Sequence, residues 1–302
     1  MKKILLLVCV ILFGSANAFF FGHSYEEPLK INTDGLMKFP KNEYGYLLNR
    51  VYKPNKYEEG KVYPAVVVMP PCTGATSFKK NSLFSWADMF STNGFVTLQM
   101  EHLVPRKKGG PPYNCGGSNK RKVEDHDMVR DLYDAMDALA SLDYVNKDQI
   151  FAVGFSLGAM TIAKASSANE YKKHGIRGDK KSIRFRAASG LYGGCVFGRN
   201  EQYEYLHWDT DKPLLWLMGS ADPEAPVASC NSRVKDAMED VPGFEFHVYE
   251  GATHCWDCKD QDGYVRTLPA GKGKHTYRYS EDVTKDSQKR VLEYFKKFIA
   301  NS

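Results

Sequence analysis

The chain has 302 residues, of which 43% are hydrophobic, 25% charged and 13% aromatic. That length suffices for one large α/β domain or two ordinary ones, and the composition is that of a globular protein. The formal net charge of +5 comes from 41 Lys and Arg against 36 Asp and Glu, scattered along the chain. So small and dispersed an excess argues against a nucleic-acid-binding protein.

Residues 1–18 are predicted to be a signal peptide. Two lysines precede the apolar run 4–13, and Ala16-Asn-Ala18 matches the A-x-A cleavage pattern. The apolar run is too short to anchor the chain in a bilayer. We therefore expect an exported protein, periplasmic or secreted, that begins at Phe19 and has no membrane span in its mature part.

Cysteine usage agrees with export. Six cysteines remain beyond the predicted cleavage site: Cys72, Cys115, Cys195, Cys230, Cys255 and Cys258. An even number in an exported protein favours disulfides over free thiols or zinc ligation. The sequence does not decide among the possible pairings.

The first half of the mature chain begins with an extension over 19–62, in which two short strands indicate a hairpin. The extended runs are 36–39 and 44–52, and the turn residues Pro-Lys-Asn separate them. After the extension we expect a buried strand at 63–69, a helix at 83–92, a strand at 95–100, a long Gly- and Pro-rich loop at 102–121 and a helix through 129–139. A structureless loop of that length is typical of a binding loop.

The second half continues the alternation of strands and helices. We expect strands at 150–153, 183–191, 213–218 and 244–249, helices at 159–168, 230–238 and 283–299, a polar surface segment at 169–183 and a polar loop at 257–280. This alternation predicts a single α/β domain over 19–302, with a mostly parallel central sheet and helices on both faces.

The segment Gly154-Phe-Ser-Leu-Gly158 fits the pattern G-x-S-x-G between a predicted strand and a predicted helix. A serine on such a sharp turn is lifted out of the sheet, and the glycines let strand and helix pass closely. This context favours a catalytic Ser156 over a mere turn residue. The amide of Leu157 then lies at a helix N-terminus, where it can bind an oxyanion.

A catalytic serine needs a base to take its proton and a carboxylate to orient the base. With this turn, the partners follow in the order Ser, Asp or Glu, His, each after a strand. Asp222 follows the strand at 213–218 and is the expected acid, although it would also suit a helix cap, and Glu224 is the alternative. His254 follows the strand at 244–249 and is the expected base, whereas His247 lies within that strand.

The second oxyanion donor is expected in the loop after the strand at 63–69. Pro70 and Pro71 have no N–H to donate. The first available amide is therefore that of Cys72, with Thr73 next.

Five segments resemble the dienelactone hydrolase family of α/β-hydrolases. They are V-V-V-M-P-P-C-T-G (66–74), G-F-S-L-G (154–158), L-Y-G-G-C (191–195), L-M-G-S-A-D-P-E-A-P (217–226) and Y-E-G-A-T-H-C-W-D (249–257). The resemblance runs from about residue 63 to the C-terminus. It implies an α/β-hydrolase fold with Ser156 as nucleophile, Asp222 as acid and His254 as base, and neither a cofactor nor a metal.

The chain also departs from the family pattern. The enzyme that gives the family its name uses cysteine as nucleophile, whereas this chain, like many relatives, has serine. Pro70-Pro71 replaces the common His-Gly of the oxyanion loop. Of the arginines that bind a dienelactone carboxylate, Arg106 is the candidate counterpart here. Tyr192 and Trp256 are further candidates for contact with the substrate.

Cys255-Trp-Asp-Cys258 fits C-x-x-C, which together with His254 and His275 would suit a zinc or redox site. The motif follows a strand in a loop rather than opening a helix, and this favours structural disulfide cysteines. The acidic stretch 260–263 lacks the remaining ligands of a calcium loop.

We therefore predict a serine hydrolase that cleaves a small-molecule ester, thioester or lactone through an acyl-enzyme, without a cofactor. Three alternatives stay open: a non-catalytic binding protein on the same scaffold, a peptidase with the same triad, and a disulfide oxidoreductase built on the C-x-x-C. The natural substrate and the oligomeric state are not predicted.

The first testable prediction concerns the N-terminus. Cleavage after Ala18 leaves Phe-Phe-Phe as the start of the mature chain. N-terminal sequencing of the protein from the extracytoplasmic fraction is expected to read these three residues. Recovery there of a chain that still begins with Met1 contradicts the prediction.

Overall fold

The structure, a computed structural model, describes residues 50–75, 82–100, 123–197, 203–231, 233–234, 241–268 and 273–299. The following predictions lie wholly or partly outside these ranges: the signal peptide, the extension before residue 50 with its strand at 36–39, the whole loop at 102–121 with Arg106 and Cys115, and residues 232 and 235–238 of the helix at 230–238.

A seven-stranded sheet forms the centre of the described structure, with strand order β1-β3-β2-β4-β7-β10-β11. Its strands are β1 (Arg50–Tyr52), β2 (Tyr63–Met69), β3 (Val96–Gln99), β4 (Val145–Phe155), β7 (Ala188–Leu191), β10 (Leu214–Gly219) and β11 (Glu245–Tyr249). All neighbouring pairs are parallel except β1 and β3, which run antiparallel. The prediction of a mostly parallel sheet is confirmed.

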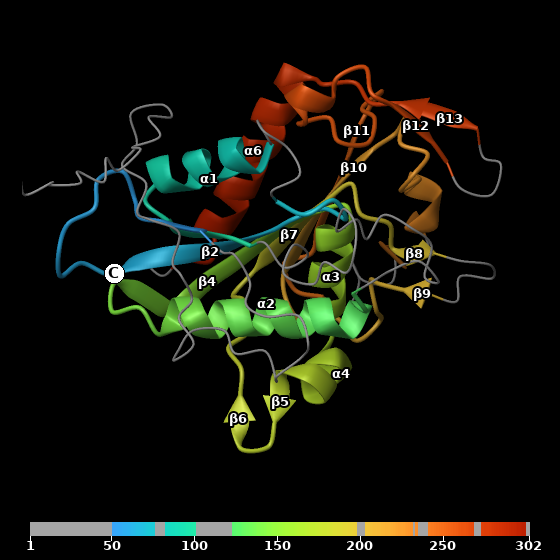
Figure 1. Cartoon of the computed structure of the whole chain (residues 1–302). Coiled ribbons are helices and arrows are strands. Elements are labelled where there is room, and N and C mark those ends of the chain that lie inside the picture. The colour runs from blue at the N-terminus through green and yellow to red at the C-terminus, as the bar shows by residue number, and fades with distance from the viewer. Residues whose placement is uncertain are drawn as a thin grey trace, which may run out of the picture.

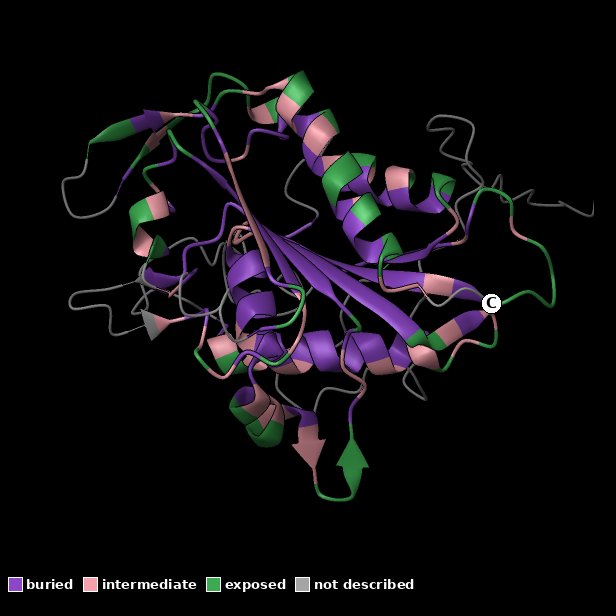
Figure 2. Cartoon of the chain, turned by 180° about the vertical axis from the view of Figure 1, so that it is seen from behind, coloured by how far each residue is buried: buried purple, intermediate pink, exposed green. Residues whose placement is uncertain are grey.

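Helices cover both faces of this sheet (Figure 1). On one face lie α1 (Ser82–Thr92) and α6 (Glu281–Lys296), and on the other lie α2 (Asp125–Ala140) and α3 (Leu157–Ser166). Strands packed between two helical layers are apolar on both sides, and Figure 2 shows the central strands buried along most of their length.

The side chains of β2 show how one strand supplies two cores. Val66 and Val68 belong to the hydrophobic cluster that includes α1 and α6. Ala65, Val67 and Met69 belong to the cluster that includes α2 and α3. Successive side chains of a strand point to opposite faces, so an unbroken apolar run is what a strand between two helical layers requires.

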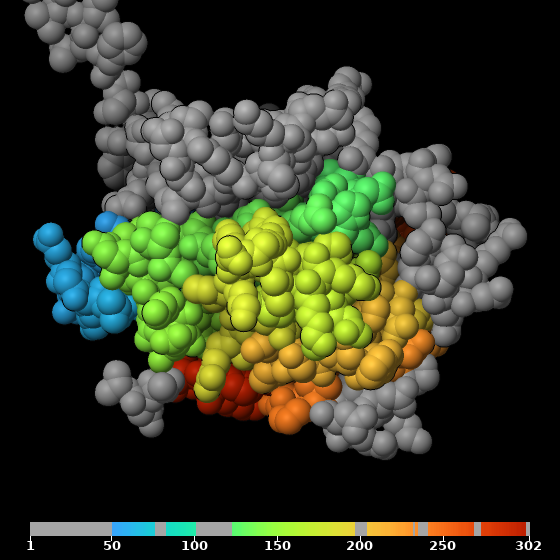
Figure 3. Space-filling view, turned by 90° about the horizontal axis from the view of Figure 1, so that it is seen from below, coloured from blue at the N-terminus to red at the C-terminus, as the bar shows by residue number. Residues whose placement is uncertain are grey.

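Shorter elements connect these layers. They are α4 (Ala168–Glu170), the π-helical turn η3 (Tyr171–Gly175), β5 (Ile176–Arg177), β6 (Lys180–Lys181), β8 (Val196–Phe197), β9 (Tyr203–Glu204), η5 (Val227–Ser229), η6 (Lys259–Gln261), β12 (Val265–Thr267) and β13 (Lys274–Thr276). The polar segment predicted at 169–183 contains the end of α4, followed by η3, β5 and β6. It lies at the surface of the molecule (Figure 3).

Three expectations need correction or completion. The strand predicted at 183–191 begins only at Ala188. The Ile183 amide donates to Asp137 and Arg184 pairs with Asp211, so its first residues bond away from the sheet, whereas Arg186 and Ala187 already bond to β4. The segment at 257–280 is not a plain loop, since β12 and β13 pair in it as an antiparallel hairpin. The described part of the strand predicted at 44–52 is β1, and it pairs with β3.

Membrane insertion through a helix finds no support in the part of the chain that the structure describes: none of the helices there has both the length and the apolar character to cross a bilayer.

Candidate active site

Three parallel strands of the sheet end near the candidate site. Ser156 comes directly after β4, Asp222 follows the end of β10, and His254 follows the end of β11 after a short turn. Because the carboxyl ends of parallel strands lie at one edge of a sheet, the topology alone brings these side chains to the same edge.

Ser156 occupies a strained turn between β4 and α3. Its φ of 51° and ψ of −114° lie outside the regions that L-residues ordinarily occupy. Its amide donates to the carbonyl of Leu191 at 3.0 Å, and its carbonyl accepts from the Met160 amide at 3.1 Å. Hydrogen bonds on both sides of the residue therefore hold the strained conformation.

The two glycines of the motif are required by space. A Cβ on Gly154 would lie 2.4 Å from the carbonyl oxygen of Gly158. A Cβ on Gly158 would lie 2.6 Å from the carbonyl oxygens of both Met69 and Pro70. The predicted reason for the glycines is thus confirmed, and the second contact shows that the start of α3 lies against the loop after β2.

The structure joins Ser156, His254 and Asp222 in one chain of hydrogen bonds. Ser156 Oγ lies 3.0 Å from His254 Nε2, and His254 Nδ1 lies 2.7 Å from Asp222 Oδ2. A carboxylate can only accept, so Nδ1–H donates to Asp222 and leaves the Nε2 lone pair to accept the serine proton.

The Asp222 oxygen that does not face His254 accepts hydrogen bonds from backbone amides. Oδ1 accepts from the amides of Glu224 at 2.8 Å and Ala225 at 3.1 Å. Asp222 and His254 are both buried, with 3% and 5% of their surface exposed, whereas Ser156 is partly exposed. A buried carboxylate with three hydrogen bonds is a stable ionised group.

The same contacts set the two pKa values. Burial by itself lowers the pKa of His254, but the charge of Asp222 and its hydrogen bond outweigh burial and raise that pKa above its ordinary value. Burial by itself raises the pKa of Asp222, but His254 and the two backbone amides leave that pKa below its ordinary value. Both shifts favour the pair of imidazolium and carboxylate.

Glu224, the alternative acid, points elsewhere. Its carboxylate accepts from the Tyr277 hydroxyl at 2.7 Å and pairs with Arg266 Nε at 2.9 Å. Arg266 lies on β12, and the Tyr277 ring lies 5.7 Å from the His254 ring. The structure therefore places Asp222, and not Glu224, against the histidine, and it adds the β12–β13 hairpin to the surroundings of the site.

The candidate oxyanion amides lie on the two segments that meet at Gly158. Leu157 is the first residue of α3, and Cys72 lies just after the end of β2. Cys72 is disulfide-bonded. The backbone after β2 is thereby tied at the position where the second donor is predicted.

Two of the residues predicted to contact the substrate, Tyr192 and Trp256, lie in the hydrophobic core. Tyr192 is 1% exposed and Trp256 is fully buried. The ring of Tyr192 meets both His254 and Trp256 edge to face, with centroids 4.9 Å apart in each case. Their contact with a substrate stays a prediction, and Arg106 lies outside the described residues.

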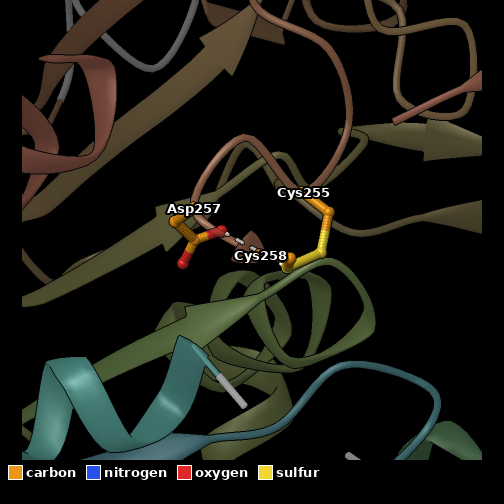
Figure 4. A group of neighbouring side chains, drawn as sticks. All are labelled: Cys255, Asp257 and Cys258. Atoms are coloured by element: carbon orange, nitrogen blue, oxygen red, sulfur yellow. Dashed lines mark hydrogen bonds between the residues drawn. A yellow bond between two sulfur atoms is a disulfide. The ribbon is translucent and has the colours of Figure 1, made fainter. Parts of the chain in front are cut away.

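The predicted disulfide cysteines pair as Cys195–Cys230 and Cys255–Cys258. Figure 4 shows the second of these with Asp257, a set of three potential metal ligands in the described part of the chain. Metal coordination by cysteine requires the thiolate. Since the two sulfurs are bonded to each other, this group is not a thiolate site, and the structure agrees with the disulfide interpretation of C-x-x-C.

Sequence reasoning missed Arg266, Tyr277 and the buried carboxyl group of Asp257. The hairpin that carries Arg266 had a usable signal, because turn-forming Pro and Gly at 269–273 separate two short segments with β-branched residues. Asp257 had none, since its partners Trp86 and Tyr192 are far from it in the sequence.

Two curated proteins are similar to part of the chain. The uncharacterized protein YcjY of Escherichia coli (strain K12) is 28% identical over 117 residues, which are 38% of this chain and 35% of YcjY. Acyltransferase drtE of Aspergillus calidoustus is 31% identical over 134 residues, which are 43% of this chain and 39% of drtE. The chain thus spans less than half the length of these relatives.

Solved structures match more of the chain, at lower identity. A candidate dienelactone hydrolase from Klebsiella pneumoniae subsp. pneumoniae is 17% identical with a TM-score of 0.60, covering 83% of this chain and 93% of its own. Apo esterase 2 of Thermogutta terrifontis is 15% identical with a TM-score of 0.59, covering 87% and 94%. These likenesses establish the fold. The Dienelactone hydrolase family matches residues 50–299, and the chain belongs to that family.

Proposed function

We propose that the protein is a serine hydrolase that cleaves a small-molecule carboxylic ester, thioester or lactone, with Ser156 as nucleophile, His254 as base and Asp222 as orienting acid. The observation that carries this proposal is the continuous hydrogen-bonded chain from Asp222 through His254 to Ser156, with distances of 2.7 and 3.0 Å. A carboxylate, an imidazole and a hydroxyl in that order are the requirements for an activated serine.

In the first half-reaction, Ser156 Oγ attacks the carbonyl carbon of the substrate while His254 Nε2 takes the serine proton. The carbonyl oxygen becomes an oxyanion, and the imidazolium is stabilised by the carboxylate of Asp222. His254 then gives its proton to the leaving oxygen or sulfur, the bond to the leaving group breaks, and the acyl group remains on Ser156.

In the second half-reaction, water takes the place of the serine. His254 accepts a proton from water, the resulting hydroxide attacks the acyl carbon, and the proton returns to Ser156 Oγ as the acid product leaves. All atoms come from substrate and water, so this chemistry uses no cofactor.

The oxyanion is proposed to bind the amides of Leu157 and Cys72. Each such donor contributes roughly 3–4 kcal/mol of transition-state stabilisation in sites of this kind. Support comes from the start of α3, which points backbone N–H groups out of its N-terminus, and from its close approach to the loop after β2.

Membership in the dienelactone hydrolase family supports hydrolysis. Esterase 2 of Thermogutta terrifontis has been solved phosphonylated by cyclosarin, with 15% identity to this chain and a TM-score of 0.59. That adduct suggests an organophosphorus compound as the probe.

We also propose that the protein is exported. The disulfides are consistent with an oxidising compartment.

A fluorophosphonate probe is expected to label Ser156, because its phosphorus accepts the same attack as an ester carbonyl. Peptide mapping by mass spectrometry locates the adduct, and Ser156→Ala is expected to abolish it. Labelling at another serine contradicts the assignment of Ser156 as nucleophile. A native protein that hydrolyses no ester, thioester or lactone and takes up no probe favours the non-catalytic binding protein instead.

The pH profile tests the assignment of acid and base. His254 must be neutral to accept a proton, so kcat/KM rises with pH and levels off above the raised pKa of that histidine. In Asp222→Asn the carboxylate that raises this pKa is gone, so burial prevails and the rising limb moves to lower pH. We expect kcat to fall roughly 10⁴-fold, as when another triad loses its orienting carboxylate.

Glu224→Gln is the matched control, since the Glu224 carboxylate bonds to Tyr277 and Arg266 and not to His254. It is expected to change kcat by no more than about threefold, less than one typical hydrogen bond. A crippling effect of Glu224→Gln together with a mild effect of Asp222→Asn contradicts the assignment.

The two described disulfides are expected to differ in effect. Cys195–Cys230 spans 35 residues and Cys255–Cys258 only 3, so loop entropy predicts losses on removal of about 4 and about 2 kcal/mol. Cys255 directly follows His254, so loss of the Cys255–Cys258 bond is expected to loosen the base. The double variant Cys255→Ser and Cys258→Ser is therefore expected to have a lower kcat even under conditions in which urea-induced unfolding shows that it is still folded. Full kcat in that variant contradicts the prediction.

A further inference from the structure

Asp257 is a buried carboxyl group to which the proposed reaction gives no role. It lies three residues after His254 in the turn closed by the Cys255–Cys258 disulfide (Figure 4), and only 3% of its surface is exposed. Burying a carboxyl group is costly unless its oxygens are hydrogen-bonded. The hydrogen-bond partners of Asp257 therefore indicate what this buried carboxyl group does in the fold.

Each oxygen of Asp257 accepts from a buried aromatic side chain. Trp86 Nε1 on α1 donates to Oδ2 at 2.8 Å, and the hydroxyl of Tyr192 donates to Oδ1 at 2.9 Å. Trp86 and Tyr192 are 0% and 1% exposed. One carboxyl group thus connects three parts of the fold: the turn after His254, helix α1 and the end of β7.

The bond to Tyr192 reaches the imidazole. The Tyr192 ring lies against the His254 ring with centroids 4.9 Å apart and an interplanar angle of 60°. Tyr192 also adopts a φ of 42°, which is uncommon for a bulky side chain, while its amide donates to Leu217 at 2.8 Å. The backbone is therefore held in an unfavourable conformation that brings this ring beside the histidine.

The bond to Trp86 is on the other side of the carboxyl group, toward helix α1. The Trp86 ring packs on Phe155 and Phe90, with centroids 5.3 and 6.2 Å away. The same turn is bonded to α6, because the Trp256 carbonyl accepts from the Ser280 amide, at the start of that helix, at 2.8 Å. The turn that follows the base is thus attached to both helices of this face of the sheet.

We propose that Asp257 is a positioning residue for the base: its carboxyl group holds the Tyr192 hydroxyl, and the Tyr192 ring fixes the orientation of the His254 imidazole toward Ser156. Asp222 and Ser156 restrain the two nitrogens of that imidazole, and Tyr192 restrains its plane. This inference rests on the proposed function, in which His254 is the base, and it assigns Asp257 no contact with the substrate.

The test removes one hydroxyl at a time. Tyr192→Phe keeps the ring beside His254 and loses only the bond to Asp257. Tyr133→Phe is the matched control, because Tyr133 is equally buried on α2 and its hydroxyl donates to the Ala165 carbonyl at 3.0 Å. Both changes delete one buried hydrogen bond, so both are expected to lower Tm by similar amounts.

Two readouts separate positioning from stability. Tyr192→Phe is expected to lower kcat and the rate of fluorophosphonate labelling about fivefold or more, with KM little changed, the equivalent of one lost hydrogen bond in the transition state. It is also expected to shift or broaden the NMR signal of the His254 Nδ1 proton. Tyr133→Phe is expected to leave the rates and the signal as in the wild type.

Variants at Asp257 complete the experiment. Asp257→Asn can still accept from Trp86 with its oxygen and donate to Tyr192 with its amide, so near wild-type rates are expected. Asp257→Leu keeps the branching at Cγ with a larger side chain and makes neither bond, and its loss of rate is expected to equal or exceed that of Tyr192→Phe. If Asp257→Leu does not fold, the comparison of the two tyrosine variants decides the question.

Equal rates in Tyr192→Phe and Tyr133→Phe, with an unchanged His254 signal, overturn the positioning role. The proposed function fails in a different way, through a wild-type protein that neither turns over esters nor labels at Ser156. In that case the NMR signal, which requires no turnover, still shows whether Asp257 and Tyr192 orient the imidazole.

Discussion

The short hydrogen bond between His254 and Asp222 is the interaction on which the rest of the site depends. At 2.7 Å and between two buried side chains, it determines which imidazole nitrogen carries the proton and therefore which one faces Ser156. Burial alone would keep the imidazole from becoming charged, and the carboxylate reverses that preference. The carboxylate in turn is kept ionised by two backbone amides and by the histidine itself.

This bond places demands on the surrounding structure. Three strand ends must meet at one edge of the sheet, and the backbone at Ser156 must remain at a φ of 51°. The glycines on either side of the serine leave room for that turn, and the two helical layers bury the sheet that supports it. In the proposed role of Asp257, its carboxyl group holds the Tyr192 side chain, and the Tyr192 ring packs against the His254 imidazole.

The central part of this arrangement could be predicted from the sequence because it depends on local patterns. Apolar runs indicate buried strands, and parallel strands bring their carboxyl ends together whatever the loops do. The expected positions of Ser156, Asp222 and His254 used these two facts, the spacing of two glycines around the serine, and the order serine, acid, histidine that accompanies such a turn. The same reasoning gave β2 its bounds, since Pro70 and Pro71 end the apolar run abruptly.

What the sequence did not reveal depends on contacts between distant residues. The first residues of the strand predicted from residue 183 bond instead to Asp137 and Asp211, which no local pattern contains. The roles of Tyr192 and Asp257 arise from a hydrogen bond across 65 positions of the chain. Glu224 was a reasonable alternative acid until the hairpin supplied Arg266 as its partner.

The central claim is that Ser156 and His254 work as one unit in ester hydrolysis. The most direct measurement is the turnover of an activated ester by Ser156→Ala, by His254→Ala and by the double variant, with the fold of each verified by circular dichroism. Because either change removes the same activated nucleophile, the three variants are predicted to lose nearly the same factor in kcat. Losses that multiply in the double variant, or a Ser156→Ala variant with wild-type turnover, would contradict the account.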